Sequence, residues 1–481
     1  MYSQLITAER RKPSSIGDRN LIDETSSDKS RVIFSGPFRR LQQKAQVFSL
    51  ETNSSVRSRL THSLEVADYG KLIAYKITNS LIEAGNLKSE LQIPFVNIVE
   101  TACLLHDVGN LPFGHFGEAA IQQWFKKHWE KYFKKAIGEN IQMDEISKLM
   151  ADFIEFDGNP QGFRIVTTLQ NPAMGYIGYG LNLTKTQLFS FLKYLRTAGE
   201  EKGEGIYKKA GFFNSEKHIV DNLKTTFNRI GRFPLAYIME AADDMSYCLS
   251  DIEDGVEKGI LSIREFFEYL RIEWKKLSSN VSLPFDLDLI IDSESTSYND
   301  KFFFFKTKVA RSLIEVSSKT YVERHSDILN GKVDQLIEKE SDADKLLESL
   351  KSLSKKHLFR SREAENNELA GHAVIYGLLE KFSLLLSIPR DHFQSLIDFK
   401  NDSKSIKGKD LDIELRLFNR LPAKYIEAYE YAIHNNPCNF ALSHDELEWY
   451  YRCHLIVDFI AGMTDLYSLN LYKLLHGIKI D

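Results

Sequence analysis

The stretch CLLHDVGNLPFGHFGE, residues 103–118, closes an apolar run with an adjacent histidine and aspartate, His106 and Asp107. A second histidine, His115, and a glutamate, Glu118, follow before the stretch ends. Imidazole and carboxylate groups can hold a metal, exchange protons, or simply satisfy each other at a helix end. On the dipeptide alone all three interpretations stay open, because most buried histidines are core residues with a local hydrogen bond.

Composition predicts a large soluble globular protein. The 481 residues are 43% hydrophobic and 27% charged, which is ordinary for such a chain. There is no apolar run of membrane-spanning length, and the N-terminus MYSQLITAERRKPSS lacks the apolar core of a secretory signal. We therefore expect no membrane partner and a cytoplasmic location. The four cysteines form no CxxC pair, which disfavours a thiolate zinc site.

The spacing of apolar residues is helical through most of the chain and predicts an all-α fold with at most a minor β-hairpin. The clearest predicted helices are 63–85, 93–109 and 233–259. Polar stretches rich in Gly, Ser or charge predict loops at 20–30, 197–211, 277–301 and 400–411. The best strand-like piece is FDLDLIID, residues 285–292.

Two further segments strengthen the metal interpretation of the opening stretch. His62 stands near the start of one predicted helix, and Asp243, Tyr247 and Asp251 recur at intervals of four on another. At that spacing the three side chains share one helix face. Burying two carboxylates and a phenol there without partners would cost several kcal/mol, so a metal or a polar ligand is the natural partner. Histidine and aspartate without thiolates suit Mn²⁺, Mg²⁺ or Fe²⁺ better than structural zinc.

Three extended motifs surround these residues: RSRLTHSLEVA (57–67), HDVGNLPFGHFGE (106–118) and MEAADDMSYCLSDIEDG (239–255). Together they resemble the bacterial deoxyguanosinetriphosphate triphosphohydrolase (dGTPase) family of the HD-domain metal-dependent phosphohydrolase superfamily. The resemblance implies an HD-domain helical core with a helical C-terminal extension. We expect an N-terminal segment at 1–33, the core at 34–260, and a C-terminal region at 261–481 that completes the site and supplies oligomer contacts.

The resemblance implies two layers of chemistry. His62, His106, Asp107 and Asp243 match the metal ligands of the family, with Mn²⁺ or Mg²⁺ as the expected cofactor. His115 and Glu118 match its catalytic pair. We expect His115 to position or deprotonate the attacking water, or to protonate the departing 5′ oxygen, with Glu118 fixing its tautomer.

The remaining matches are expected to bind substrate. Arg59, Lys193, Tyr194 and Lys209 match positions at or near the phosphates, and Asn159 matches an asparagine near the active site. Gln46 and Val47 match sugar and base contacts, and Tyr247 and Asp251 match positions that recognise the sugar. Glu368 is a candidate acceptor for guanine. An arginine from a neighbouring subunit is also expected to read the base, with Arg416, Arg420 and Arg452 as candidates.

These matches predict an enzyme that hydrolyses dGTP at the α-phosphorus to deoxyguanosine and triphosphate, and so controls dNTP pools. Other dNTPs are further candidate substrates. The alternatives are another HD-type nucleotide phosphohydrolase, either a 5′-nucleotidase or a broad dNTPase, and a nucleic-acid-binding HD scaffold. The family also predicts a homo-oligomer, with a hexamer favoured, and single-stranded DNA as a candidate regulator. The segment KFFFFK (301–306) is either a core piece, which is favoured, or a subunit contact.

Overall fold

The computed structural model describes residues 2–139, 143–170, 175, 177–277, 297–399 and 409–478. The chain divides into two compact units, and neither is a continuous segment. The first unit comprises Met1–Asp107, Thr184–Lys193 and Lys224–Asn367. The second comprises Val108–Leu183, Tyr194–Leu223 and Glu368–Asp481. The three-segment division expected from the sequence stays a prediction.

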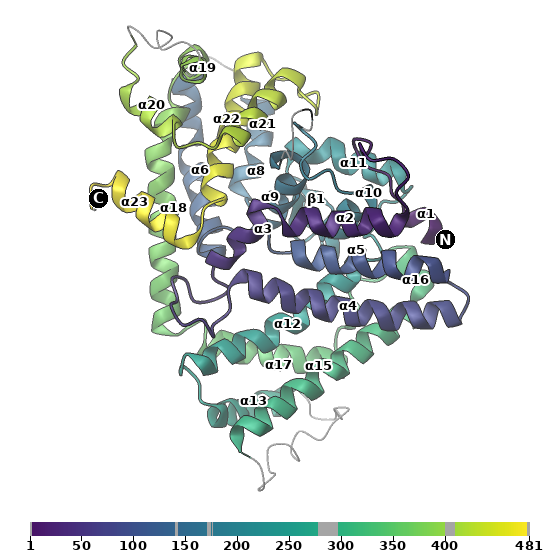
Figure 1. Ribbon diagram of the computed structural model, residues 1–481. Helices are drawn as coiled ribbons and strands as arrows, with labels where there is room; N and C mark the ends of the chain where they lie inside the picture. The colour runs from purple at the N-terminus through teal and green to yellow at the C-terminus, as the bar shows by residue number, and fades with distance from the viewer. Residues whose placement is uncertain are drawn as a thin grey trace. The chain divides into compact units, whose positions relative to one another are not determined.

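The centre of the first unit is formed by α4 (Arg59–Glu83) and α5 (Gln92–Leu105), with α12 (Ala236–Glu257) packed against both (Figure 1). Most side chains of α5 are apolar and buried, which explains its central place. Gly70 allows α4 to approach α5 closely, because a Cβ at that position would lie 2.5 Å from Cys103 Sγ.

Four longer helices cover this centre. α2 lies on α5, α15 lies on α4, and α17 packs on both α12 and α13. Their bounds are α2 (Leu21–Ile33), α13 (Ile263–Leu277), α15 (Tyr298–Glu323) and α17 (Asp342–His357). The shorter elements of this unit are α1 (Tyr2–Leu5), α3 (Gly36–Arg40), η1 (Leu41–Gln43), η2 (Ser89–Leu91), α10 (Lys185–Phe191) and α16 (His325–Leu329).

The second unit is built on α6 (Gly114–Ile137), which packs against α8 (Ala151–Ile154) and α22 (His444–Ala461). Aromatic rings fill its core, as in the stacked pair Phe125 and Phe153, whose centroids lie 4.6 Å apart. Its other elements are α7 (Asp144–Leu149), α9 (Gly158–Arg164), η3 (Ile165–Leu169), β1 (Arg196–Thr197), η4 (Gly205–Tyr207), β2 (Ala210–Phe212), η5 (Asn214–Glu216), α19 (Arg390–Asp398), α20 (Asp412–Phe418), α21 (Ala423–Asn435) and α23 (Asp465–Leu475).

Two helices contain residues of both units: α11 (Lys217–Thr226) and α18 (Arg362–Leu386). Within the part of the chain that the structure describes, α18 is the single helix long and apolar enough to cross a membrane by length and composition, and half of its apolar window is buried.

The predicted all-α fold is confirmed, but the minor strand element is not a hairpin. β1 and β2 pair in parallel, with Arg196 opposite Ala210. Parallel strands need a connection that reverses the chain direction, and here η4 lies in that connection. The strand-like segment 285–292 lies outside the described residues, as do 278–296 of one expected loop and 400–408 of another.

The loop predicted at 20–30 is wrong, because this segment lies in α2. Asn20 caps the helix by accepting the N–H of Asp23 (2.9 Å), and buried Asp28 pairs with Arg10 (2.6 Å). Asp28 also accepts from the hydroxyl of Thr184 (2.7 Å). Part of the polar composition therefore reflects buried hydrogen bonds to distant segments rather than exposure to solvent.

The segment KFFFFK lies in the first turns of α15 and is only half a core piece. Phe302 and Phe305 are buried and pack edge-on against Phe266, at centroid distances of 5.3 and 5.4 Å. Phe303 and Phe304 point outward and are 63% and 51% exposed. A subunit contact through these two rings stays a prediction.

Candidate functional site

Helix ends place the first group of candidate residues in the first unit. Ser58 forms a capping box with Thr61 and starts α4, so His62 stands in the first turns of that helix. α5 ends at Leu105, earlier than predicted, and His106 is its C-cap. His106 and Asp107 therefore belong to the turn after the helix, and Asp243 comes from α12.

These four side chains form one cluster. Ligand atoms of His62, His106 and Asp107 lie within 4.8 Å of one another. Asp243 Oδ1 is 3.6 Å from Nε2 of each histidine, and Asp107 Oδ1 is 3.6 Å from His106 Nε2. One carboxylate oxygen from each aspartate therefore faces the two imidazoles.

The second oxygen of each carboxylate faces a cation. Asp107 Oδ2 accepts from Arg59 Nη1 at 2.7 Å, and Asp243 Oδ2 is 3.2 Å from Lys193 Nζ. Burial alone would raise the pKa of both acids. Arg59 and the two imidazoles nevertheless hold the pKa of Asp107 below its usual value, and Lys193 with the same imidazoles holds that of Asp243 well below it. Both carboxylates are thus kept ionised, although Asp107 is buried and Asp243 is half-buried.

The imidazoles are oriented for binding a cation. His106 Nδ1 donates to the carbonyl of Cys103 (2.7 Å), and His62 Nδ1 lies 3.4 Å from Ser246 Oγ. Among the described residues, the buried Nε2 atoms of both histidines have no hydrogen-bond partner. Metal-binding histidines commonly present one nitrogen in this way while the other is fixed by a carbonyl or hydroxyl. The donor set of two imidazoles and two ionised carboxylates fits a divalent metal.

The second unit holds a separate pair, His115 and Glu118, in the first turns of α6. His115 Nδ1 donates to Glu118 Oε2 at 2.7 Å, and the backbone N–H of Gly158 donates to Glu118 Oε1 at 2.8 Å. Both oxygens of this carboxylate are therefore engaged. The side chain of His115 is 82% exposed, whereas that of Glu118 is 9% exposed. This geometry fixes the ring of His115 and directs its Nε2 away from Glu118.

Close backbone packing makes the Gly158 contact possible. Gly109, in the turn after the histidine–aspartate pair, crosses α9 so tightly that a Cβ would lie 2.0 Å from the carbonyl oxygen of Gly158. A Cβ on Gly158 itself would lie 2.3 Å from Asn110 Oδ1. Glycine at both positions is thus required for the N–H of Gly158 to reach Glu118.

Asn159 and Lys209 meet at Asp157, the N-cap of α9. The backbone and side-chain amides of Asn159 donate to Asp157 Oδ1 at 2.9 and 2.6 Å, and Lys209 Nζ is 3.1 Å from Asp157 Oδ2. Burial lowers the pKa of Lys209, but the carboxylates of Asp157 and Glu118 raise it above its usual value. Tyr194 is buried in the same unit beneath the ammonium of Lys208, which lies 5.7 Å from its ring centroid.

The expected sugar and base contacts have distinct surroundings. Gln46 Oε1 is 3.4 Å from Arg59 Nη1, and half-buried Val47 packs on the apolar cluster of Phe48, Val56 and Ala364. The rings of Tyr247 and Phe359 have centroids 6.3 Å apart. Asp251 is fully buried, neither of its oxygens makes a hydrogen bond of ordinary geometry among the described residues, and burial raises its pKa to about 8.

Glu368 lies half-buried on α18, one turn before Gly371. Gly371 packs on the turn before His115, since a Cβ there would lie 2.3 Å from Cβ of Phe113.

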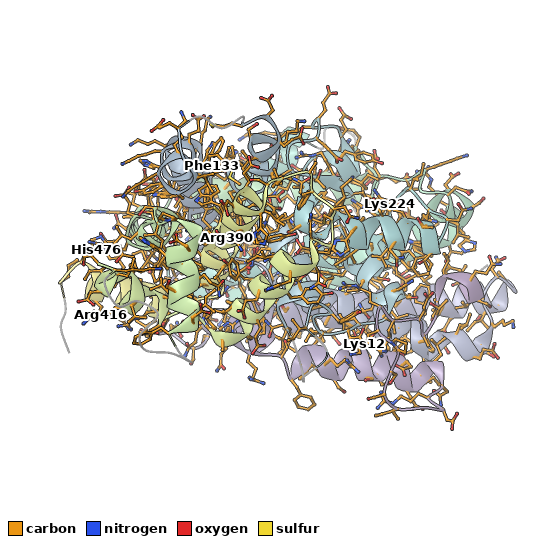
Figure 2. All side chains as sticks on the ribbon, turned by 90° about the horizontal axis from the view of Figure 1, so that it is seen from above. Lys12, Phe133, Lys224, Arg390, Arg416 and His476 are labelled. Atoms are coloured by element: carbon orange, nitrogen blue, oxygen red, sulfur yellow. The ribbon has the colours of Figure 1, made fainter. Side chains whose placement is uncertain are left out.

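The three arginines considered as base readers differ sharply. Arg452 is fully buried and donates to Glu448 and to the carbonyls of Leu385 (2.9 Å) and Ile388 (2.7 Å). It cannot reach a neighbouring subunit, so that candidate is wrong. Arg416 on α20 is 70% exposed and lies at the margin of the second unit (Figure 2). Arg420 is also exposed.

Sequence analysis missed groups that act through the backbone or the next helix turn. The carbonyl of Cys103, the N–H of Gly158 and the hydroxyl of Ser246 orient candidate residues. Ser246 stands three residues after Asp243, a spacing that shares a helix face, so the sequence did carry a signal for it. A backbone donor leaves no such signal.

Comparison with known proteins identifies the family. A model of the HD domain matches residues 59–159. The deoxyguanosinetriphosphate triphosphohydrolase of Yersinia enterocolitica is 37% identical over an alignment that covers 98% of each chain. The proteins of the same name from Cronobacter sakazakii and Yersinia pseudotuberculosis are both 36% identical and cover 94% and 98% of both chains.

This chain belongs to the deoxyguanosinetriphosphate triphosphohydrolase family. It is an enzyme, and its HD domain places it among the metal-dependent phosphohydrolases. The HD-domain match includes His62, His106 and Asp107 and ends at Asn159. Asp243 and Lys193 lie beyond it, so the cluster of this triphosphohydrolase draws on residues outside the match.

Proposed function

We propose that this enzyme hydrolyses dGTP to deoxyguanosine and triphosphate by attack of water on the α-phosphorus. The observation that carries the proposal is the first-unit cluster, in which two ionised carboxylates and two oriented imidazoles face one another. His62, His106, Asp107 and Asp243 would hold Mn²⁺ or Mg²⁺, which supplies a Lewis acid for a phosphoryl oxygen and acidifies the attacking water. The names of the relatives support the choice of dGTP as substrate.

His115 is assigned the proton transfer. Because its Nδ1–H donates to Glu118, Nε2 is the nitrogen that can take up a proton from water or return one. In the overall reaction a water oxygen bonds to the α-phosphorus and the bond from that phosphorus to the 5′ oxygen breaks. One proton of the water ends on the 5′ oxygen of deoxyguanosine. His115 acts as the base, as the acid, or by positioning the water, and the pair with Glu118 serves each role.

The phosphate chain is assigned to Arg59, Lys193, Tyr194, Lys209 and Asn159. A nucleoside triphosphate carries about four negative charges, which charge-assisted hydrogen bonds must offset locally in a chain with a net charge of −5. Arg59 and Lys193 already contact the cluster carboxylates, so each would link a metal ligand to a phosphate oxygen.

The nucleoside is assigned to Gln46, Val47, Tyr247, Asp251 and Glu368. Tyr247 packed on the sugar leaves no room for a 2′-hydroxyl, and the buried carboxyl of Asp251 offers a partner for the 3′-hydroxyl. Glu368 is the proposed acceptor for the N–H groups of guanine, and either Arg416 or Arg420 of a neighbouring subunit is the proposed reader of its acceptor edge. A homo-oligomer, with a hexamer favoured, regulation by single-stranded DNA and action in the cytoplasm complete the proposal.

Product analysis tests this function directly. Purified protein is incubated with each dNTP, GTP and dGMP in Mn²⁺ or Mg²⁺, and the products are resolved by ion-exchange chromatography. We expect equal amounts of deoxyguanosine and triphosphate from dGTP. Pyrophosphate with dGMP, or phosphate released from dGMP, would favour another nucleotide hydrolase, and equal turnover of all four dNTPs would favour a broad dNTPase.

A matched pair of variants ties the turnover to the cluster. Asp243→Asn should abolish it. Asp244→Asn, a neutralisation at the next residue, should keep most of it, because the ion pair of Asp244 is with Lys351 at 4.0 Å, whereas Lys193 pairs with Asp243. Equal loss in both variants would disconnect the activity from the cluster. Binding of single-stranded DNA by a protein inactive on every nucleotide would instead support the scaffold alternative.

A further inference from the structure

Two buried aspartates flank the connection between α22 and α23, and the proposed chemistry has no use for them. Asp458 lies in the last turn of α22 and is 1% exposed, and Asp465 is the first residue of α23 and is 3% exposed. Both lie in the second unit, where the two helices meet (Figure 1). A buried carboxylate is costly unless it is hydrogen-bonded or paired, so the partners of these two residues indicate their role.

Asp465 holds the backbone at the entry to α6. Its Oδ1 accepts the N–H of Phe113 at 3.2 Å, two residues before His115. Phe113 is the N-cap of α6 and has a left-handed backbone, with φ 61° and ψ 18°, which a phenylalanine rarely adopts. Because Asp465 fixes the N–H of Phe113, it also fixes the direction of the first turn of α6, which contains His115.

Asp458 holds α9. Its Oδ1 accepts from Gln161 Nε2 at 3.0 Å, and both of its oxygens accept from the guanidinium of Arg164 at 2.9–3.0 Å. Arg164 is 2% exposed and also donates to Glu216 at 2.8 Å. The first residue of α9 is Gly158, whose N–H donates to Glu118. Fixing the end of this short helix therefore fixes the donor that holds Glu118.

We infer that Asp458 and Asp465 are positioning residues for the pair His115 and Glu118. One aspartate reaches His115 through Phe113, and the other reaches Glu118 through α9. Both members of the pair are thereby held in place by one region of the C-terminal part of the chain, the junction of α22 and α23. The inference rests on the proposed function, because it assigns the purpose of this geometry to proton transfer by His115.

Two substitutions at Asp465 test the first of these links. Asp465→Ala removes the acceptor of the Phe113 N–H and should lower kcat on dGTP by about ten- to a hundredfold, with KM within about twofold, since small misplacements of a catalytic group act on turnover. Asp465→Asn keeps a carbonyl oxygen at the same place and should restore most of kcat.

Thr464→Ala is the matched control for stability. The hydroxyl of Thr464 caps α23 by accepting the N–H of Tyr467 (3.4 Å), and among the described residues this side chain makes no hydrogen bond with α6. It should lower the thermal midpoint while kcat stays unchanged. A fall in kcat equal to that of Asp465→Ala would show that the loss reflects general loosening and would overturn the inference.

A double-mutant cycle separates action through His115 from any other effect. In a His115→Ala background, Asp465→Ala should cause no further loss of residual turnover, because the group it positions is gone. The same fold loss in both backgrounds, or no loss in either, would overturn the inference.

Hydrogen exchange supplies a readout that needs no turnover. Backbone amides of residues 113–118 should exchange faster in Asp465→Ala than in the wild type, and at the wild-type rate in Asp465→Asn and Thr464→Ala. For the second link, Asp458→Asn should speed exchange across α9. If the wild type has no activity on dGTP, the proposed function fails by that result alone. Unchanged exchange in Asp465→Ala would refute the positioning contact.

Discussion

The metal-type cluster of the first unit and the His115–Glu118 pair of the second are built by opposite means. In the cluster, the side chains of His62 and His106 are 1% and 5% exposed, and each carboxylate has a cation beside its second oxygen. In the pair, His115 is 82% exposed and hydrogen-bonds to Glu118. Burial requires charge balance, whereas exposure allows a group to exchange protons with what approaches it.

This difference predicts which measurements will respond to mutation. Removing a member of the cluster breaks a buried balance of charge, so stability and metal binding should fall together with activity. Removing His115, the exposed member of the pair, should change turnover alone, because little buried surface or charge depends on it. The predictions below use this contrast, beginning with the largest expected effect.

Asp107→Asn should have the largest effect. It removes one carboxylate ligand from the proposed metal site and leaves the guanidinium of Arg59 without its buried counter-charge. Loss of several kcal/mol of transition-state stabilisation corresponds to a decrease in kcat of about a thousandfold or more. Breaking the buried pair should also cost about 3 kcal/mol of unfolding free energy. Steady-state kinetics measure the decrease in kcat, and denaturant unfolding measures the free energy of unfolding. Titration calorimetry with Mn²⁺ measures metal binding. A variant of wild-type stability that still binds metal would contradict this view of the cluster.

His115→Gln should lower kcat by about a hundred- to a thousandfold, the range of general acid–base catalysis. The thermal midpoint and the affinity for Mn²⁺ should remain those of the wild type, since the side chain is exposed and is not in the cluster. Steady-state kinetics and calorimetry on one preparation provide the check. Loss of metal binding would show instead that His115 is a ligand.

Arg59→Lys should produce an intermediate decrease. The charge beside Asp107 is kept, but the contact of Nη1 with both Asp107 (2.7 Å) and Gln46 (3.4 Å) needs the reach of a guanidinium. Loss of a group that orients a metal ligand typically costs about ten- to a hundredfold in activity or metal affinity. Arg57→Lys is the matched control, because Arg57 pairs with Glu65 and Glu253 rather than with the cluster. Equal losses in both variants would argue against a specific role for Arg59.

The sequence predicted the helices and the face of α12 that carries Asp243, Tyr247 and Asp251, because helical spacing is a local property. It could not predict that Arg59 pairs with Asp107 or that Lys193 pairs with Asp243, since these contacts join segments distant in the chain. The loop wrongly predicted at 20–30 fails for the same reason, because the partners of Asp28 are Arg10 and Thr184. Contacts of backbone atoms, such as Gly158 with Glu118, leave no pattern of side chains.

Glu118→Gln should give the smallest effect in this series and tests how the exposed pair is held. The amide oxygen still accepts the N–H of Gly158, but the amide nitrogen cannot accept from His115 Nδ1. Losing a hydrogen bond to a charged group costs at least about 1.5 kcal/mol, and we expect this lower end, a fall in kcat of about tenfold, because the N–H of Gly158 still holds the side chain. The decrease should disappear in a His115→Gln background, whereas a further loss there would mean that Glu118 acts on the substrate itself rather than through the imidazole. Because Glu118 is buried and His115 is not, Glu118→Gln should also lower the thermal midpoint slightly, which His115→Gln should not.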